Sequence, residues 1–193
     1  MTRRILTGCV LALAAGAAMA STVIGLSVED QARLSTMVVV GEVLHQRGVN
    51  HPEHGIETAV TLKVTEVLKG DVRTKQAITF HTRGGEVDGE ISQAMGEAIF
   101  KPGETVLVFI ESVDGRLYNL GLSMGVWKVH ENAIGDVTFT RDIQDGLSIV
   151  GEAAVQHGPL PYAEMVSRVR YAARNPRVDN DMVRGRLIEG RER

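Results

Sequence analysis

The chain is poor in cysteine. Its 193 residues include a single one, Cys9, which lies within the first twenty residues. We expect these residues to be removed on export, so the mature protein is predicted to have no thiol. This excludes disulfide bridges and thiolate metal sites. At this length an apolar core alone can hold a domain together.

The chain also lacks a basic surplus and the short motifs of several enzyme classes. Its formal net charge is −3, which argues against a nucleic-acid-binding surface. It has no H-E-x-x-H sequence for a metalloprotease, and GGEVDG (84–89) is not a G-x-G-x-x-G dinucleotide fingerprint, so no cofactor is expected. Aromatic residues make up only 4% of the chain, and we expect Phe109, Tyr118 and Trp127 in the core rather than in a ligand patch.

Residues 1–20 have the features of a secretory signal peptide. Arg3 and Arg4 precede an apolar run, and Ala18-Met19-Ala20 fits an A-x-A cleavage site. The run is too short to span a membrane, which takes about 20 apolar residues. We expect cleavage after Ala20 and a secreted or periplasmic protein with no membrane attachment. Removal of the two arginines from a net charge of −3 leaves −5.

Two other export signals can be found in the same residues. LTGC (6–9) resembles a lipobox, which would place a lipid on Cys9, but most of the apolar run follows that cysteine. Arg3-Arg4 also hints at twin-arginine export, although the rest of that signature is missing. The ordinary secretory route is therefore favoured.

The rest of the chain is dominated by short segments of strand character. Residues 58–64 alternate between apolar and polar, and the phase slips at Glu66, which predicts a β-bulge. The run TVLVFI (105–110) is apolar without alternation, as is typical of a strand buried on both faces. Other strands are expected at 37–43, 77–83, 116–121, 125–130, 136–141 and 147–150.

Helices and loops are expected between and beyond these strands. Ser27 and Asp30 form a capping box for a short helix that ends near Ser35, and residues 162–174 have helical spacing. HQRGVNHPEHGI (45–56) is expected to be a loop, and residues 86–103 a long connection with a helical piece near Ile91–Met95. The charged segment 177–193 is expected to be a disordered tail.

Many short strands without long helices between them predict a mainly β protein, a small antiparallel barrel or sandwich. They argue against a parallel α/β sheet. No linker or internal repeat is visible, so we expect one domain over residues 21–176, flanked by a short N-terminal helix and a C-terminal helix.

A family resemblance is carried by five segments in a fixed order, namely VVVGEV (38–43), TLKVTEVLKGD (61–71), ITFHTRGGEVDG (78–89), FKPGETVLVFI (100–110) and GLSMGVWKV (121–129). Over about residues 37–129 the chain resembles a family of secreted bacterial proteins of uncharacterised function. More remotely, it is similar to the netrin-like module and the tissue inhibitors of metalloproteinases. The resemblance implies an OB-type barrel that binds a protein, with an extracellular protease as one class of partner. Those inhibitors chelate the protease zinc through a mature N-terminal cysteine, whereas the mature end here is predicted to be Ser21-Thr22.

The stretch GLSMG (121–125) matches G-x-S-x-G, the nucleophile elbow of serine hydrolases. An elbow needs a helix after the serine, whereas VWKVH (126–130) has the composition of a strand. Ser123, Asp142 and His157 follow the hydrolase order, but the chain lacks the alternating strands and helices of that fold. We therefore expect no enzyme, and an exposed Ser123 in or beside a turn, with its hydroxyl bonded to water or nearby backbone.

A second alternative is metal binding by a group of histidines. They lie close together in the predicted loop with acidic residues beside them, namely His45, His51, His54, Glu53 and Glu57. His81, on the outward face of a nearby strand, could join them. Imidazoles and carboxylates are good ligands for zinc or copper, but ordering a loop costs conformational entropy, and we expect no metal to be bound.

Two pairings of glycine with a cation have the composition of an anion site, Lys69-Gly70 and Arg83-Gly84-Gly85. Glycine at these places is better explained by turns that need positive φ, with the charges in solvent. The sequence therefore favours an exported, non-enzymatic β-barrel that binds another protein. A metal-binding protein and a serine hydrolase are the two alternatives.

Overall fold

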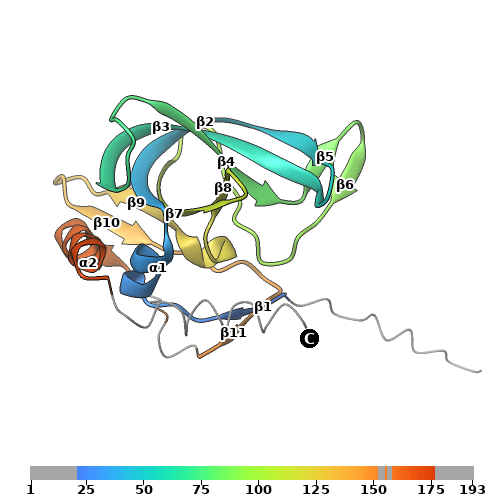
Figure 1. Cartoon of the computed structure of the whole chain (residues 1–193). Coiled ribbons are helices and arrows are strands. Elements are labelled where there is room, and N and C mark those ends of the chain that lie inside the picture. The colour runs from blue at the N-terminus through green and yellow to red at the C-terminus, as the bar shows by residue number, and fades with distance from the viewer. Residues whose placement is uncertain (1–20, 152–154, 156–157, 177–193) are drawn as a thin grey trace, which may run out of the picture.

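A computed structural model describes residues 21–151, 155 and 158–176 (Figure 1). The predicted signal peptide, with Cys9, and the predicted tail at 177–193 lie outside the described residues. The protein is mainly β, as expected, with a large and mostly antiparallel sheet and two α-helices. In the described part of the chain, no helix combines the length and the apolar character needed to cross a membrane.

The first half of the described chain contains β1 (Ser21–Ile24), α1 (Val28–Leu34), β2 (Met37–His51), β3 (Gly55–Lys69), β4 (Ala77–Arg83), β5 (Gly85–Val87) and β6 (Glu90–Ser92). The second half contains β7 (Thr105–Val113), β8 (Arg116–Asn119), the 3-10 helix η1 (Leu122–Gly125), β9 (Val126–Glu131), β10 (Val137–Thr140), β11 (Leu147–Val150), β12 (Leu160–Pro161) and α2 (Tyr162–Arg174). The strands expected from alternation are all present, and α2 has the predicted bounds.

Eight strands form the large sheet in the order β12-β10-β9-β7-β2-β3-β4-β8, and β8 also pairs with β7. Strand pairing therefore runs from β7 through β2, β3, β4 and β8 and returns to β7. All of these neighbours are antiparallel except β4 and β8, which are parallel where His81 lies beside Tyr118. Figure 1 shows β2 and β3 as long, curved strands in this part of the molecule. β1 pairs with β11, and β5 with β6, in two separate two-stranded sheets.

The core consists of two clusters that share β2 and β7. On β7, Leu107 and Phe109 pack in the cluster that contains the helices, whereas Val106, Val108 and Ile110 pack in the other cluster with β3 and β4. Residues 106–110 are all fully buried, which confirms the prediction from the unbroken apolar run. Successive side chains of a strand point to opposite faces, so a strand buried on both faces must be apolar at every position.

The two α-helices lie together on one side of the sheet (Figure 1). The Ser27 hydroxyl accepts a hydrogen bond from the Asp30 amide at 3.1 Å, so the predicted N-cap of α1 is confirmed. At the other end, Lys69 Nζ donates to the carbonyl oxygens of Ala32, at 2.7 Å, and of Ser35. Lysine therefore satisfies carbonyls that a helix C-terminus leaves unpaired, which corrects the expectation that the Lys69 charge lies in solvent. Gly70 has the positive φ expected of a turn, at 105°.

The bulge predicted near Glu66 is confirmed. Val40 pairs with Glu66 and Gly41 with Val64, so Thr65 has no partner of its own across the β2–β3 ladder. An extra residue on one strand bends it and increases its twist. This device allows β3 to curve while its apolar side chains remain in the core.

The loop predicted at 45–56 is wrong. β2 continues to His51 and pairs with β3 from His45 opposite Thr61 to His51 opposite Gly55. The composition of this segment is poor for a strand, but pairing with the strongly alternating β3 satisfies its backbone. Gly48 has a packing role, because a Cβ at this position would lie 1.8 Å from the Glu86 carbonyl oxygen of β5.

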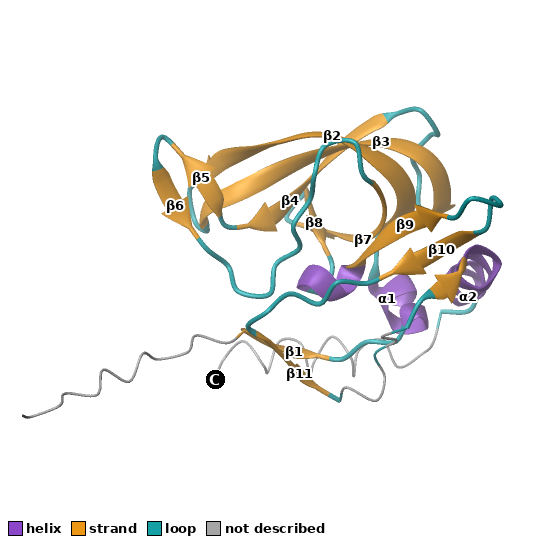
Figure 2. Ribbon diagram, turned by 180° about the vertical axis from the view of Figure 1, so that it is seen from behind, coloured by secondary structure: helices purple, strands orange, loops and turns teal. Residues whose placement is uncertain are grey.

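The helical piece predicted near Ile91–Met95 is also wrong. Residues 85–92 form the β5–β6 hairpin, whose turn residues Asp88 and Gly89 both have positive φ, at 52° and 84°. An Asp-Gly pair is a strong signal for such a two-residue turn. The hairpin pairs these backbones locally, and the chain then continues as an extended loop to β7 (Figure 2).

Candidate binding site

The described surface is hollowed beside the end of β4. The hollow has a volume of about 300 Å³ and is lined by residues 82–85, 92–95, 97–99 and 144–145. We call it the Glu97 hollow. Its walls come from the end of β4, the loop after β6 and the segment before β11, which lie far apart in the sequence.

Two glycines shape the wall of the hollow at the end of β4. Gly84 and Gly85 have φ of 79° and 142°, which residues with a side chain rarely adopt. A Cβ on Gly84 would lie 2.7 Å from the Ser92 carbonyl oxygen, so only glycine allows the end of β6 to approach here. The turn reading of Arg83-Gly84-Gly85 is thus supported, and these glycines bring the loop after β6 back to β4.

The Glu97 carboxylate is fixed at the side of the hollow. Its Oε2 accepts a hydrogen bond from the Arg83 amide at 3.1 Å. Its Oε1 accepts from the Ala98 amide at 3.2 Å and from Asn119 Nδ2 at 2.9 Å. Asn119 is itself buried and also donates to the Leu122 carbonyl oxygen at 3.0 Å. One carboxylate therefore joins β4, its own loop and the end of β8.

Burial raises the pKa of the Glu97 carboxyl above its usual range, because loss of solvent disfavours the charged form. The three hydrogen bonds act in the opposite direction but are the smaller influence. A carboxylate in this state gains from a nearby positive charge, since a cation would stabilise its ionised form. Arg83, which lines the same hollow, supplies one such charge.

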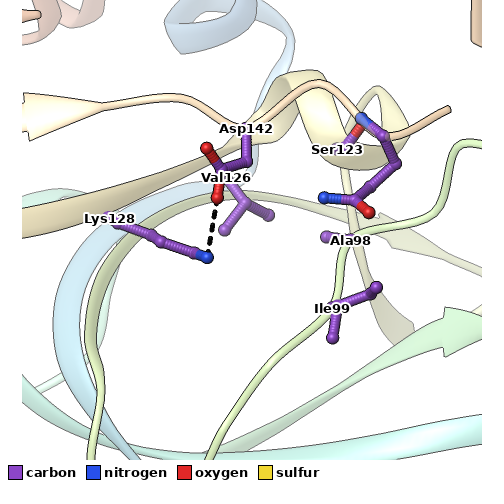
Figure 3. Close-up of a pocket in the computed structure, with 7 residues that line it drawn as sticks. Ala98, Ile99, Ser123, Val126, Lys128 and Asp142 are labelled. Atoms are coloured by element: carbon purple, nitrogen blue, oxygen red, sulfur yellow. Dashed lines mark hydrogen bonds and ion pairs between the residues drawn. The ribbon is translucent and has the colours of Figure 1, made fainter.

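A small recess adjoins the Glu97 hollow and shares Ala98, Ile99 and Gln144 with it. The recess holds about 10 Å³, which is room for about one water molecule. Figure 3 shows Ser123 and Val126 at this recess, with Lys128 and Asp142 joined by an ion pair of 2.8 Å.

The structure corrects the expectation that Ser123 is exposed. Ser123 lies in η1, is 1% exposed, and accepts a hydrogen bond at its Oγ from the Gln144 amide at 3.2 Å. Its own amide donates to the Gly96 carbonyl oxygen at 3.0 Å. Gly121 starts the turn with φ of 78°. The serine therefore joins η1 to the loop after β6 and to the segment before β11.

The arrangement around Ser123 differs from a nucleophile elbow in two respects. Strand β9 follows η1 directly, as the sequence predicted, where an elbow has a helix. Asp142 is paired with Lys128, and among the described residues no histidine donates to or accepts from Ser123 Oγ. His157, the third residue of the proposed order, lies outside the described residues.

The histidines of the metal alternative are placed on the β2–β3 hairpin rather than in a loop. The rings of His51 and His54 stack at 4.5 Å, and His51 Nδ1 accepts hydrogen bonds from the Glu53 and His54 amides, both at 3.2 Å. His45 lies earlier on β2, opposite Thr61. Among the described residues, no three His, Cys, Asp or Glu side chains are grouped closely enough to hold a metal ion.

Glu57 and His81, which were considered as additional ligands, lie in a different cluster. Glu57 is 1% exposed and accepts hydrogen bonds from Arg116 Nη2 at 2.8 Å and from the Tyr118 hydroxyl at 2.9 Å. The His81 ring lies 5.8 Å from the Tyr118 ring, and burial lowers the pKa of His81. Both oxygens of Glu57 are used within the fold, so this cluster is structural. Phe109 and Trp127 are core residues, as expected, whereas Tyr118 is half-buried and belongs to neither core cluster.

The Glu97 hollow was not predicted from the sequence. Glu97, Asn119 and Gln144 belong to no motif. Asn119 is joined to Glu97, and Gln144 to Ser123, by two hydrogen bonds between residues distant in sequence. A partial signal is present in the glycines Gly84, Gly85 and Gly96, which all have positive φ. Several such glycines in one connection indicate close backbone approach, although they do not indicate which polar side chain lies there.

The lining of the Glu97 hollow combines charge with exposed apolar surface. It includes the acids Glu97 and Asp145 and one base, Arg83, and its Ile99 is 61% exposed. The lining thus places an exposed apolar side chain next to charged groups. Comparison of the chain with protein-family models and with curated proteins finds no match.

Proposed function

We propose that the protein is an exported, non-enzymatic binding module that takes a loop of another protein into the Glu97 hollow. The observation that carries the proposal is the combination of a fixed, partly buried carboxylate with an exposed isoleucine in one hollow of about 300 Å³. Exposed apolar side chains beside oriented polar groups are the usual composition of a protein-binding patch.

The scaffold proposed for this module is an OB-type barrel formed by β2, β3, β4, β7 and β8. Its support is the pairing order, in which these five strands return to their starting point through the contact of β8 with β7. The OB fold is a five-stranded, partly open barrel. The curvature that such a barrel needs is supplied at the bulge of β3 and at Gly41, where a Cβ would lie 2.6 Å from the Lys63 carbonyl oxygen.

The proposed partner presents an apolar side chain to Ile99 and a basic side chain to Glu97 and Asp145. The expected net charge of −5 for the exported chain favours a basic partner, because opposite charges steer association. A cation from the partner would replace part of the solvation that Glu97 has lost. An extracellular protease is the partner class implied by the resemblance to the metalloproteinase inhibitors.

Contact through the Glu97 hollow would differ from the inhibitors' mechanism, which uses a free N-terminal cysteine. Here Ser21–Ile24 pair in parallel with Leu147–Val150, and Gly25 donates to the Val150 carbonyl oxygen at 2.7 Å. The segment that follows the expected cleavage site is thus engaged within the fold. For this reason we place the partner at the hollow and not at the N-terminus.

A photo-crosslinker introduced in place of Ile99 tests the proposal. The matched control is the same substitution of Ile134, which is 83% exposed and lies between β9 and β10. Incubated with envelope and medium of the producing cells, the Ile99 variant should give a discrete protein adduct that the Ile134 variant does not give. Equal adducts from both positions, or none from Ile99, would remove the basis of the proposal.

A charge-reversal variant distinguishes specific binding from nonspecific association. Asp145→Lys places a like charge against the proposed basic side chain of the partner. The Ile99 adduct should decrease strongly in this background, since like charges across an interface oppose association. Asp88→Lys, on the β5–β6 turn, is the control and should leave the adduct unchanged. A decrease of the same size in both variants would show only a dependence on net charge.

A further inference from the structure

A second feature of interest is a buried arginine that has no hydrogen-bond partner among the described residues. Arg141 directly follows β10 and is only 8% exposed. Its Nε, Nη1 and Nη2 atoms are all buried and form no hydrogen bond with any residue that the structure describes. Buried polar groups are nearly always hydrogen-bonded, and a guanidinium offers five donors. Three unsatisfied nitrogens on one buried side chain therefore need an explanation.

The described surroundings of Arg141 provide an aromatic ring but no counter-charge. The guanidinium carbon lies 4.0 Å from the centroid of the Trp127 ring. Trp127 is fully buried, and its Nε1 also has no hydrogen-bond partner in the described part of the chain. Among the described residues no ion pair joins Arg141 to an acid. The charged group that most affects it is another cation, Arg168, which is itself bound to Glu29 at 2.6 Å.

Arg141 keeps its positive charge at neutral pH. Burial and the neighbouring Arg168 lower the pKa of Arg141 to about 9, which is still well above neutrality. Stacking on Trp127 compensates part of the lost solvation, because the face of an indole ring attracts cations. A ring does not accept the in-plane N–H donors of the guanidinium, so these remain available. A buried cation in this state is costly unless an anion pairs with it.

This arginine is separate from the Glu97 hollow and its recess. Val126 and Lys128 line the recess, whereas Trp127 between them belongs to the core cluster that contains the helices. Alternate residues of a strand point to opposite faces, so Arg141 on Trp127 lies across the sheet from the recess. The two features can therefore be tested independently.

We propose that Arg141 and Trp127 form a binding site for a small oxyanion, a carboxylate or a phosphate. The planar fork of a guanidinium matches the paired oxygens of both groups. The indole Nε1–H is a further unpaired donor beside it. Because the guanidinium is almost entirely buried, the ligand is a small anion and not a large charged surface.

The chain offers a direct reporter, because Trp127 is its only tryptophan. The indole region of a ¹H–¹⁵N NMR spectrum should therefore contain one cross-peak, which belongs to this site. Formate and inorganic phosphate are titrated separately into the mature protein at a fixed excess of sodium chloride. We expect a saturable shift of this cross-peak with at least one of them, and the two titrations show which oxyanion is preferred.

Three variants complete the test. Arg141→Met should abolish the saturable shift, and Arg141→Lys should weaken the affinity by about ten-fold or more, because an ammonium group lacks the bidentate fork. Arg73→Met removes an exposed arginine far from Trp127 in the sequence and should leave the titration unchanged. A shift that does not saturate, or that persists in Arg141→Met, would overturn the proposal.

A melting curve without formate or phosphate shows whether the guanidinium is already satisfied. If Arg141 has no internal partner, Arg141→Met should melt at or above the temperature of the unmodified protein, because an uncompensated charge has been replaced by apolar surface. Melting well below it would show that the guanidinium is paired within the protein, and would also overturn the site. The crosslinking result at Ile99 has no bearing on either outcome.

Discussion

Ser123→Ala is the substitution that best separates a structural serine from a catalytic one. The change removes an Oγ that is 1% exposed and accepts the Gln144 amide at 3.2 Å. A donor left unpaired in a buried place costs about 1–3 kcal/mol. The recess beside Ser123 holds about 10 Å³, room for one water that could bond to the Gln144 amide in the variant. We therefore expect a cost at the lower end of this range, a decrease of about 1 kcal/mol in the free energy of unfolding.

The assay is thermal unfolding of the purified mature protein, followed by circular dichroism and checked by urea denaturation. For a domain of this size, 1 kcal/mol corresponds to a decrease in Tm of about 2–4 °C. Ser148→Ala is the matched control, because Ser148 is exposed and should change stability by less than about 0.5 kcal/mol. If Ser123→Ala melts like this control, the hydrogen bond to Gln144 contributes nothing and the reasoning fails.

The unmodified protein and the Ser123→Ala variant also decide whether Ser123 is catalytic. A fluorophosphonate probe should not label the unmodified protein, because the Ser123 hydroxyl is buried and bonded to backbone. Covalent labelling that disappears in Ser123→Ala, with the folded state retained, would make this serine a nucleophile. The module would then be an enzyme, contrary to the proposed function.

Four further predictions concern other parts of the molecule. Gly125→Val should destabilise more than Ser123→Ala, by about 2–3 kcal/mol or more in urea denaturation, because a Cβ at Gly125 would lie 1.8 Å from the Leu120 carbonyl oxygen; an unchanged urea midpoint would contradict this close approach. Val108→Asp should prevent folding, as judged by circular dichroism, since it buries an unpaired charge at a fully buried position, whereas Val113→Asp at the 37% exposed end of the same strand should be tolerated. The Glu97 carboxyl should titrate in side-chain NMR at a higher pH than an exposed glutamate, because burial raises its pKa. Its contribution to stability is then present at acid pH and is lost as the pH rises through the pKa of the folded state. A titration at the pH of an exposed glutamate would refute this. Calorimetry should find no zinc affinity tighter than roughly micromolar, since His51 Nδ1 already accepts hydrogen bonds from two backbone amides. Stoichiometric nanomolar binding that is lost in the double variant His51→Ala/His54→Ala would instead support the metal alternative.

Local patterns were sufficient to predict most strands and both α-helices. Alternation over 58–64 and the apolar run at 105–110 reflect which faces of a strand are buried, and the structure has both strands there. Ser27 and Asp30 act within one helical turn, so the start of α1 is visible in four residues. The slip at Glu66 corresponds to a real bulge, because an extra residue must shift the alternation.

The parts that were missed depend on partners distant in sequence. The second half of β2 contains glycine, histidine and asparagine, and it is a strand because β3 pairs with it. Ser123 is buried because the loop after β6 and the segment before β11 cover it, and neither contact leaves a local pattern. Glu97 and Arg141 have ordinary neighbours in the sequence. Their significance follows from burial and from their hydrogen bonds, or the lack of them, in three dimensions.

The shared strands β2 and β7 also determine how the protein can come apart. Val38 and Val40 of β2 face the helix cluster, while Val39 and Val43 face the other, and β7 alternates in the same way. Separation of β2 or β7 from either cluster would therefore expose apolar side chains of both clusters. The helices and the curved strands should therefore melt in one cooperative transition, with the amides of β7 among the slowest to exchange with solvent.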